Sequence, residues 1–100
     1  MLTGKQRRHL RALAHALHPI VQVGKGGLDD GLVAAVAQAL TDHELIKVKV
    51  GPASGEGAES SKDDVAAQLA QRTKSEVAQI IGNIVLLYRA DPDKPVIELP

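Results

Sequence analysis

The segment Gly24-Lys25-Gly26-Gly27 holds the residues best suited to chemistry. Glycines let the backbone approach a phosphate closely, and Lys25 adds a positive charge. The segment matches G-x-x-G, the pattern with which KH domains hold the backbone of single-stranded nucleic acid. It is neither a P-loop, which has a longer spacing before its Gly-Lys-Ser/Thr, nor a dinucleotide fingerprint, because Asp29 stands where the third glycine belongs. A plain glycine-rich turn is the alternative, and Asp29 and Asp30 bring negative charge close to it.

Positive charge is concentrated at the start of this chain of 100 residues, although the formal net charge is zero. Residues 1–28 carry five Lys or Arg and no acid, whereas residues 29–100 carry seven bases and all twelve acids, so the two parts sum to +5 and −5. Lys5, Arg8 and Arg11 recur at a helical spacing that places them opposite a stripe of leucines. This segregation predicts an anionic partner, and a solvated helix face is the alternative.

Further basic residues fall on predicted strands. Lys47 and Lys49 share one face of a strand, where they either extend the basic surface or only protect a sheet face. Arg89 and Tyr88 end a later strand, where they either contact RNA or are structural. A tyrosine at a strand end more often packs with its hydroxyl at the rim than stacks on a base.

Several classes of function lack the residues that they need. The chain has no Cys, which excludes disulfides and thiolate chemistry, and Tyr88 is its only aromatic residue, which argues against rows of stacked bases. His15 and His18 lie one helical turn apart without a third ligand nearby, so we expect no metal site. His43 and Glu44 lack an accompanying nucleophile or paired carboxylate, and we interpret them as structural. We therefore expect no cofactor and no enzymatic activity.

Hydrophobic periodicity predicts three helices and four strands. A capping box, Thr3 with Gln6, opens the first helix. The helices are expected over residues 4–17, 29–42 and 62–72, and the strands over 20–23, 45–50, 77–81 and 84–89. Residues 91–100 form either an extension or a last edge strand at 96–99. A Gly82-Asn83 link between two strands is typical of a hairpin.

The resulting order, α-β-α-β-α-β-β, predicts one α/β domain over residues 1–100. Its sheet is mixed and has about four strands, with helices packed on it and an almost entirely aliphatic core. The two β-α-β crossovers predict parallel pairings, and the final hairpin is antiparallel. The run Ile84-Val85-Leu86-Leu87 is apolar without alternation, as in a strand that is covered on both faces.

Several blocks in one order resemble a known family, the CRM domain in its stand-alone bacterial YhbY-like form. The blocks span residues 2 to about 90 and are Leu10-Arg11-Ala12-Leu13-Ala14, Pro19, Val23-Gly24-Lys25-Gly26-Gly27-Leu28, His43-Glu44-Leu45-Ile46-Lys47-Val48-Lys49, Ile81-Gly82-Asn83 and Leu87-Tyr88-Arg89. The resemblance implies the same element order, similar to that of the C-terminal domain of translation initiation factor 3.

The resemblance also implies RNA binding without catalysis, with ribosomal RNA or precursors of the large (50S) subunit as partner. It assigns RNA contacts to Gly24, Lys25, Gly26 and Gly27, to Lys5, Arg8 and Arg11 of the first helix, and to Tyr88 and Arg89. We expect a cytoplasmic monomer with neither a membrane nor a small-molecule partner. Two alternatives stay open: an adaptor that docks its acidic surface on a basic protein of the translation machinery, and an enzyme for phosphorylated substrates, which rests on the glycine loop alone.

Overall fold

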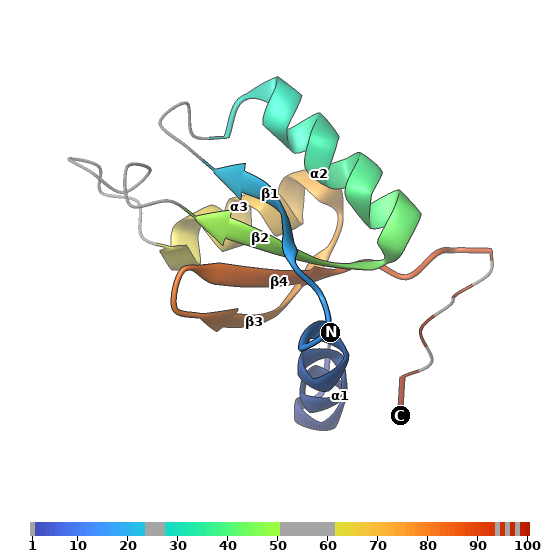
Figure 1. The fold of residues 1–100 in the computed structure, drawn as a ribbon. Helices are drawn as coiled ribbons and strands as arrows, with labels where there is room; N and C mark the ends of the chain where they lie inside the picture. Colours follow the sequence, from blue (N-terminus) through green and yellow to red (C-terminus); the bar gives the residue numbers. More distant parts are fainter. Residues whose placement is uncertain (1, 24–27, 51–61, 94, 96, 98) are drawn as a thin grey trace.

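The computed structural model describes residues 2–23, 28–50, 62–93, 95, 97, 99 and 100. Their elements follow in the order α1 (Gly4–Ala14), β1 (Pro19–Val23), α2 (Asp30–His43), β2 (Leu45–Val50), α3 (Lys62–Thr73), β3 (Glu76–Ile81) and β4 (Ile84–Tyr88) (Figure 1). This is the predicted α/β order, so the fold class is confirmed. Among the described residues, no helix has the length and apolar character that crossing a membrane requires.

The four strands form one mixed sheet in the spatial order β1-β2-β4-β3. β1 and β2 are parallel, whereas β4 is antiparallel to both β2 and β3. The prediction that the second crossover would pair two strands in parallel is wrong, because β4 lies between β2 and β3. Both faces of β4 are apolar and covered, with Val85 and Leu87 on one side and Leu86 and Tyr88 on the other, as suits a strand in the interior of the sheet.

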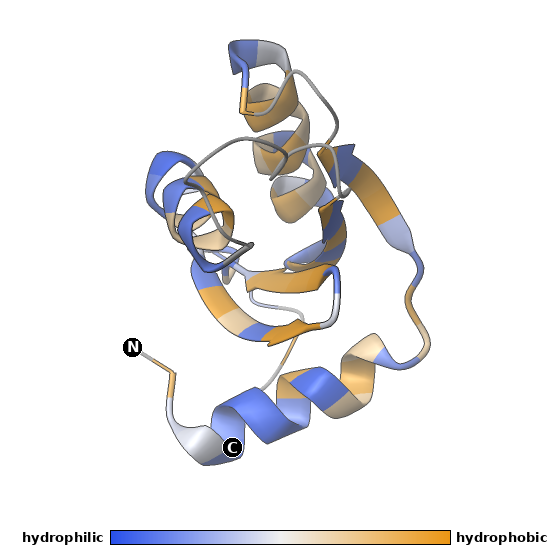
Figure 2. Ribbon diagram, turned by 90° about the vertical axis from the view of Figure 1, so that its left-hand side faces the viewer, coloured by the Kyte–Doolittle hydropathy of each residue, from blue (hydrophilic) through white to orange (hydrophobic). Residues whose placement is uncertain are grey.

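Helices cover the two faces of the sheet unequally. α2 and α3 pack on one face and α1 packs on the other, with the hydrophobic strands between them (Figure 2). The larger core cluster combines side chains of α2 and α3 with one face of the sheet; its buried members are Val23, Val36, Leu40, Ile46, Val48, Val50, Val65, Ala66, Leu69, Val85 and Leu87. The smaller cluster lies under α1 and contains Leu2, Leu10, Ala14, Leu45, Ala78, Leu86 and Tyr88.

The hairpin between β3 and β4 turns at Gly82-Asn83, as predicted. Gly82 has a φ of +57°, a conformation that glycine adopts without the steric cost of a Cβ atom. Along β4, Val85 and Leu87 belong to the larger cluster, whereas Leu86 and Tyr88 belong to the smaller one. The unbroken apolar run therefore does mark a strand that is covered on both faces.

α1 ends at Ala14, three residues before the predicted end at residue 17. The backbone N–H groups of His15 and Leu17 donate to Ala12 and Ala14, so the helix tightens into bonds between residues three apart. Pro19 disfavours a helical conformation for the residue before it, and the chain therefore leaves the helix before β1 begins. Leu17 consequently presents its backbone carbonyl to other parts of the fold.

The C-terminal segment, residues 91–100, is attached by the buried carboxylate of Glu44. Oε2 of Glu44 accepts a hydrogen bond from the Asp91 N–H (2.7 Å), and Oε1 accepts one from the Ile97 N–H (2.8 Å). The described residues of this segment form no strand, so the edge-strand alternative at 96–99 is not supported where the structure describes it. Ile97 and Leu99 instead pack against the smaller core cluster. The structural interpretation of Glu44 is confirmed.

Candidate nucleic-acid interface

α1 presents a row of basic side chains to solvent. Its first turn is fixed by the predicted capping box, in which Thr3 Oγ1 accepts from the Gln6 N–H (3.1 Å) and Gln6 Oε1 accepts from the Thr3 N–H (3.0 Å). Lys5, Arg8 and Arg11 are all exposed, and the first turn contains no acidic residue. Steps of three residues turn a helix by about 300°, so these three cations lie along one side of α1.

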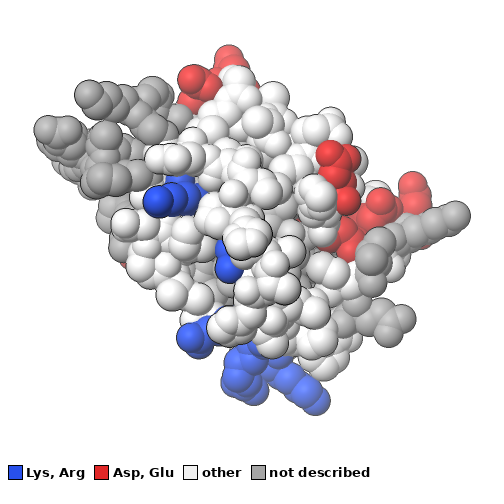
Figure 3. Space-filling model, viewed as in Figure 1, with Lys and Arg blue, Asp and Glu red and all other residues white. Residues whose placement is uncertain are grey.

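Lys47 and Lys49 lie on the sheet face that α1 covers, because they alternate with the buried strand positions of the opposite face. Lys47 is half-buried, and its Nζ donates to the backbone carbonyl of Leu17 (2.9 Å), while Lys49 is exposed. The basic side chains of this view gather over α1 and the sheet, whereas acidic side chains occupy its upper and right-hand edges (Figure 3). The structure thus brings the predicted cations of α1 and β2 to one face.

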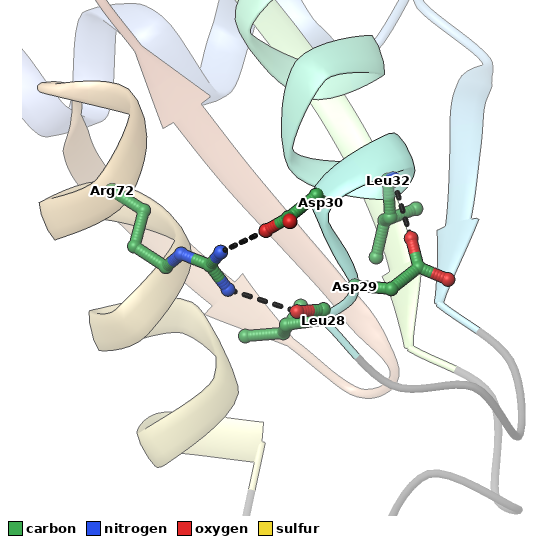
Figure 4. A network of polar contacts seen from close by, with 5 residues as sticks. All are labelled: Leu28, Asp29, Asp30, Leu32 and Arg72. Carbon is green, nitrogen blue, oxygen red and sulfur yellow. Dashed lines mark hydrogen bonds and ion pairs between the residues drawn. The ribbon is translucent and has the colours of Figure 1, made fainter.

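The Gly24–Gly27 segment lies outside the described residues, but the start of α2 that follows it is well defined. Asp29 is the N-cap, and its Oδ1 accepts from the Leu32 N–H (2.7 Å) (Figure 4). A carboxylate of the chain therefore already uses one of the N–H groups with which a helix start can bind an anion. The start of α2 is therefore a weaker candidate for holding phosphates than the exposed basic side chains.

Arg72 of α3 fixes the chain next to this helix start. Its Nη1 donates to the Leu28 carbonyl (2.8 Å) and its Nη2 to Asp30 Oδ1 (3.1 Å) (Figure 4). The ion pair is solvent-exposed and worth little by itself, so the bond to the Leu28 carbonyl is the more important contact. The sequence carried no signal for Arg72, because Leu28 lies 44 residues away.

Arg89 is separated from the basic face and holds two helices together. Nη1 donates to the Thr73 carbonyl (2.9 Å), and Nη2 donates to the Ala37 carbonyl (3.0 Å) and to Thr41 Oγ1 (2.6 Å). Thr73 is the last residue of α3, where a cation also interacts favourably with the helix dipole, whereas Ala37 and Thr41 lie in the second half of α2. Of the two roles left open for Arg89, these bonds favour the structural one.

Tyr88 is also part of the fold's interior, with 6% of its surface exposed. Burial raises the pKa of its hydroxyl above 10.0, and the carboxylates of Glu44 and Glu76 raise it further. A side chain in this position packs against the smaller core cluster rather than presenting its ring to a ligand. The structural alternative for Tyr88 is therefore favoured as well.

Two hollows flank the C-terminal end of α1. The larger, about 500 Å³, is mainly aliphatic and includes Leu13, Leu17 and Ile97 in its walls. The smaller, about 220 Å³, lies between Arg11 of α1 and the β3–β4 hairpin. Lys47 lines both hollows. In the part of the chain that the structure describes, no three His, Cys, Asp or Glu side chains are grouped as metal ligands would be.

The family model of the CRS1 / YhbY (CRM) domain matches residues 2–89. The chain belongs to the CRM domain family. The match begins before α1 and ends at Arg89, so it covers every helix and strand of the described structure. The resemblance seen in the sequence blocks is thereby confirmed for almost the whole chain.

Two relatives of this CRM domain are of similar length. The chain is 47% identical over 100 residues to the "Probable RNA-binding protein YqeI" of Bacillus subtilis, with all of both chains covered. It is 40% identical over 99 residues to an "RNA-binding protein" of Haemophilus influenzae, covering 99% of this chain and 95% of the relative. These relatives are named as RNA-binding proteins and not as enzymes.

A solved structure resembles this CRM domain closely. The solution structure of a hypothetical protein of Staphylococcus aureus, described there as a candidate RNA-binding protein, has a TM-score of 0.78 and 40% sequence identity, and all of both chains is covered. The arrangement of one helix on one face of the mixed sheet and two on the other is thus supported by a solved fold as well as by the sequence family.

Proposed function

We propose that this CRM domain binds RNA, and specifically ribosomal RNA during assembly of the large (50S) ribosomal subunit. The names of its relatives support RNA as the partner, and the YhbY-like resemblance of the sequence supports the ribosomal target. The protein acts as a cytoplasmic monomer that needs no cofactor. Its RNA surface consists of Lys5, Arg8 and Arg11 of α1, Lys47 and Lys49 of β2, and the Gly24–Gly27 segment.

The observation that carries this proposal is the convergence of cations from α1 and β2 on one side of the sheet. Lys5, Arg8 and Arg11 lie along about 9 Å of helix, and Lys49 is exposed on the strand face that α1 covers. Each cation that neutralises a phosphate releases a counterion, so a row of them supplies affinity without reading sequence. Binding is therefore expected to be directed at the backbone and at RNA shape.

Arg89 is left out of this surface because its guanidinium already donates to α2 and α3. Lys47 contributes in a limited way, since its ammonium has three donors and one of them is directed at Leu17. The Gly24–Gly27 segment is included for its residue types. It follows the buried Val23 at the end of β1, the strand that pairs with β2.

Salt-dependent binding by charge-neutral variants tests the surface. We expect Arg8→Gln and Lys49→Gln each to weaken the binding of large-subunit ribosomal RNA about three- to tenfold and to reduce the slope of log K against log salt by about one unit or slightly less. Lys74→Gln is the matched control, because Lys74 is exposed in the turn between α3 and β3 and belongs to neither α1 nor β2. Lys25→Glu tests the glycine segment in the same assay.

Three outcomes would contradict the proposal. If Lys74→Gln lowers the affinity as much as Arg8→Gln does, the basic face has no special role. A salt-independent affinity would exclude phosphate contacts as the main source of binding. Crosslinking in cells followed by sequencing of the bound RNA tests the ribosomal target, and fragments without enrichment of large-subunit ribosomal RNA would refute it.

A further inference from the structure

The smaller hollow beside α1 combines an apolar floor with a cationic rim. Leu86 of β4, which is 1% exposed, lies at its floor together with Ile84, and Ile81 at the end of β3 is 42% exposed. Arg11 and His15 of the α1 end, together with Lys47 of β2, complete the lining. Ile81 is thus an exposed aliphatic side chain beside a depression of about 220 Å³, and a flat apolar ligand could pack against it.

The charges around this hollow fit a ligand that carries phosphates. Every ionisable residue in its described lining is basic, namely Arg11, His15 and Lys47. The hollow is a poorer match for a side chain of a partner protein. The centres of protein–protein interfaces are depleted in charged residues, lysine included, whereas Lys47 lines this hollow. A nucleobase has apolar faces and is attached to a phosphate on either side, so it satisfies the floor and the rim together.

The hollow also lies along the basic surface defined above. Arg11 belongs both to the row of cations on α1 and to the rim. Lys49 pairs in register with Ile84, and the Val50 N–H donates to the Asn83 carbonyl (2.8 Å). Since Val50 is also the partner of Val23 in β1, the hairpin end that forms the hollow lies at the sheet end from which the chain continues into Gly24.

We infer that this hollow holds one unpaired nucleobase of the bound RNA while α1, Lys47 and Lys49 hold the neighbouring phosphates. The inference rests on the proposed function and adds a base contact to it. Aliphatic side chains, chiefly Ile81 and Ile84, cover the face of the base in place of aromatic residues, of which the chain has only the buried Tyr88. The larger hollow is not part of this site.

Binding of an oligouridylate of about eight nucleotides is compared with that of an abasic oligomer carrying the same number of phosphates. Wild-type protein should prefer the oligouridylate by about fivefold or more, the low end of what one base contact contributes. Ile81→Ala should lower that preference about threefold while leaving the affinity for the abasic oligomer unchanged. Leu13→Ala is the matched control, because Leu13 is also 42% exposed but lines the larger hollow.

The outcomes separate the base site from RNA binding itself. Equal affinity of the wild type for both oligomers, or equal losses for both in Ile81→Ala, overturns the base site and leaves the phosphate-binding surface in place. Binding of neither oligomer overturns both. Methyl NMR gives a second measurement on unmutated protein: the Ile81 and Ile84 methyl signals should shift with the oligouridylate and not with the abasic oligomer. Larger shifts of Leu13 and Leu17 would place the base in the other hollow and refute the assignment.

Discussion

Replacing Arg89 by alanine separates a structural role from an RNA contact. The substitution removes three hydrogen bonds, to the carbonyls of Thr73 and Ala37 and to the hydroxyl of Thr41. Those bonds connect the residue after β4 to the second half of α2 and to the end of α3, and both carbonyls lose a charged donor. The expected consequence is a large loss of stability.

The size of this loss follows from the bonds. A hydrogen bond to a charged group contributes about 1.5–3 kcal/mol, and bonds that share one guanidinium are not additive, so about 3 kcal/mol is expected for the set. For a domain of this size, 1 kcal/mol lowers the melting temperature by about 4–8 °C, so the decrease should be about 12–24 °C. Arg89→Lys should lose most of the same stability, because one ammonium cannot reproduce the planar fork of donors.

Urea unfolding followed by circular dichroism measures the free energy of unfolding of both variants. Lys49→Ala is the control, since Lys49 is exposed and a surface substitution of this kind changes stability by less than about 0.5 kcal/mol. A loss below about 1 kcal/mol in Arg89→Ala would refute the structural role. If Arg89→Ala kept the full stability of the wild type but bound RNA more weakly, Arg89 would be an RNA contact.

Three further predictions concern the rest of the polar framework. Glu44→Gln leaves one acceptor oxygen for two backbone N–H groups. The C-terminal segment should therefore lose protection from amide exchange, and the free energy of unfolding should fall by about 1–2 kcal/mol. Unchanged protection would contradict the role of Glu44 as the anchor of this segment. Burial raises the pKa of Tyr88 above 10.0, so its phenolate absorbance should appear at higher pH in the folded than in the urea-unfolded protein. Because the unfolded chain releases this proton first, the free energy of unfolding should fall as pH rises past the unfolded pKa, and coincident titrations would refute the burial argument. Arg72→Ala should lower the free energy of unfolding, measured in urea, by about 1 kcal/mol. Asp30→Ala should lower it clearly less, because only Arg72→Ala also removes the hydrogen bond to the Leu28 carbonyl. Equal losses in the two variants would exclude that bond as the main contact.

Local signals account for the elements that the sequence predicted well. The Thr3–Gln6 capping box fixes the start of α1 within a few residues of chain, and Gly82 permits the hairpin turn by itself. The alternation of Ile46 and Val48 with lysines reports which face of β2 is buried. Each of these signals depends on neighbouring residues, so tertiary structure was not needed to interpret them.

Strand neighbours and side-chain partners could not be predicted in this way. β4 lies between β2 and β3, and a β-α-β crossover pattern in the sequence does not reveal whether another strand will be inserted between its two strands. Arg72 has no signal in the sequence, and for Arg89 an RNA contact and a structural role both stayed open, because their acceptors lie 42 to 44 and 16 to 52 residues away. For the candidate interface, the sequence selected the cations of α1 and β2, and the Gly24–Gly27 segment stays a prediction.

The sequence by itself determined the element order, the family and the excess of positive charge in the first quarter of the chain, because these depend on composition and short-range spacing. Tertiary structure decided that α1 packs on the sheet face opposite α2 and α3, so that its cations lie on the same side of the sheet as Lys47 and Lys49. It also decided that Arg89 donates hydrogen bonds to α2 and α3 and that Arg11, Lys47 and Ile81 line one hollow. Such sites join distant segments, and their geometry is set by packing of the whole sheet.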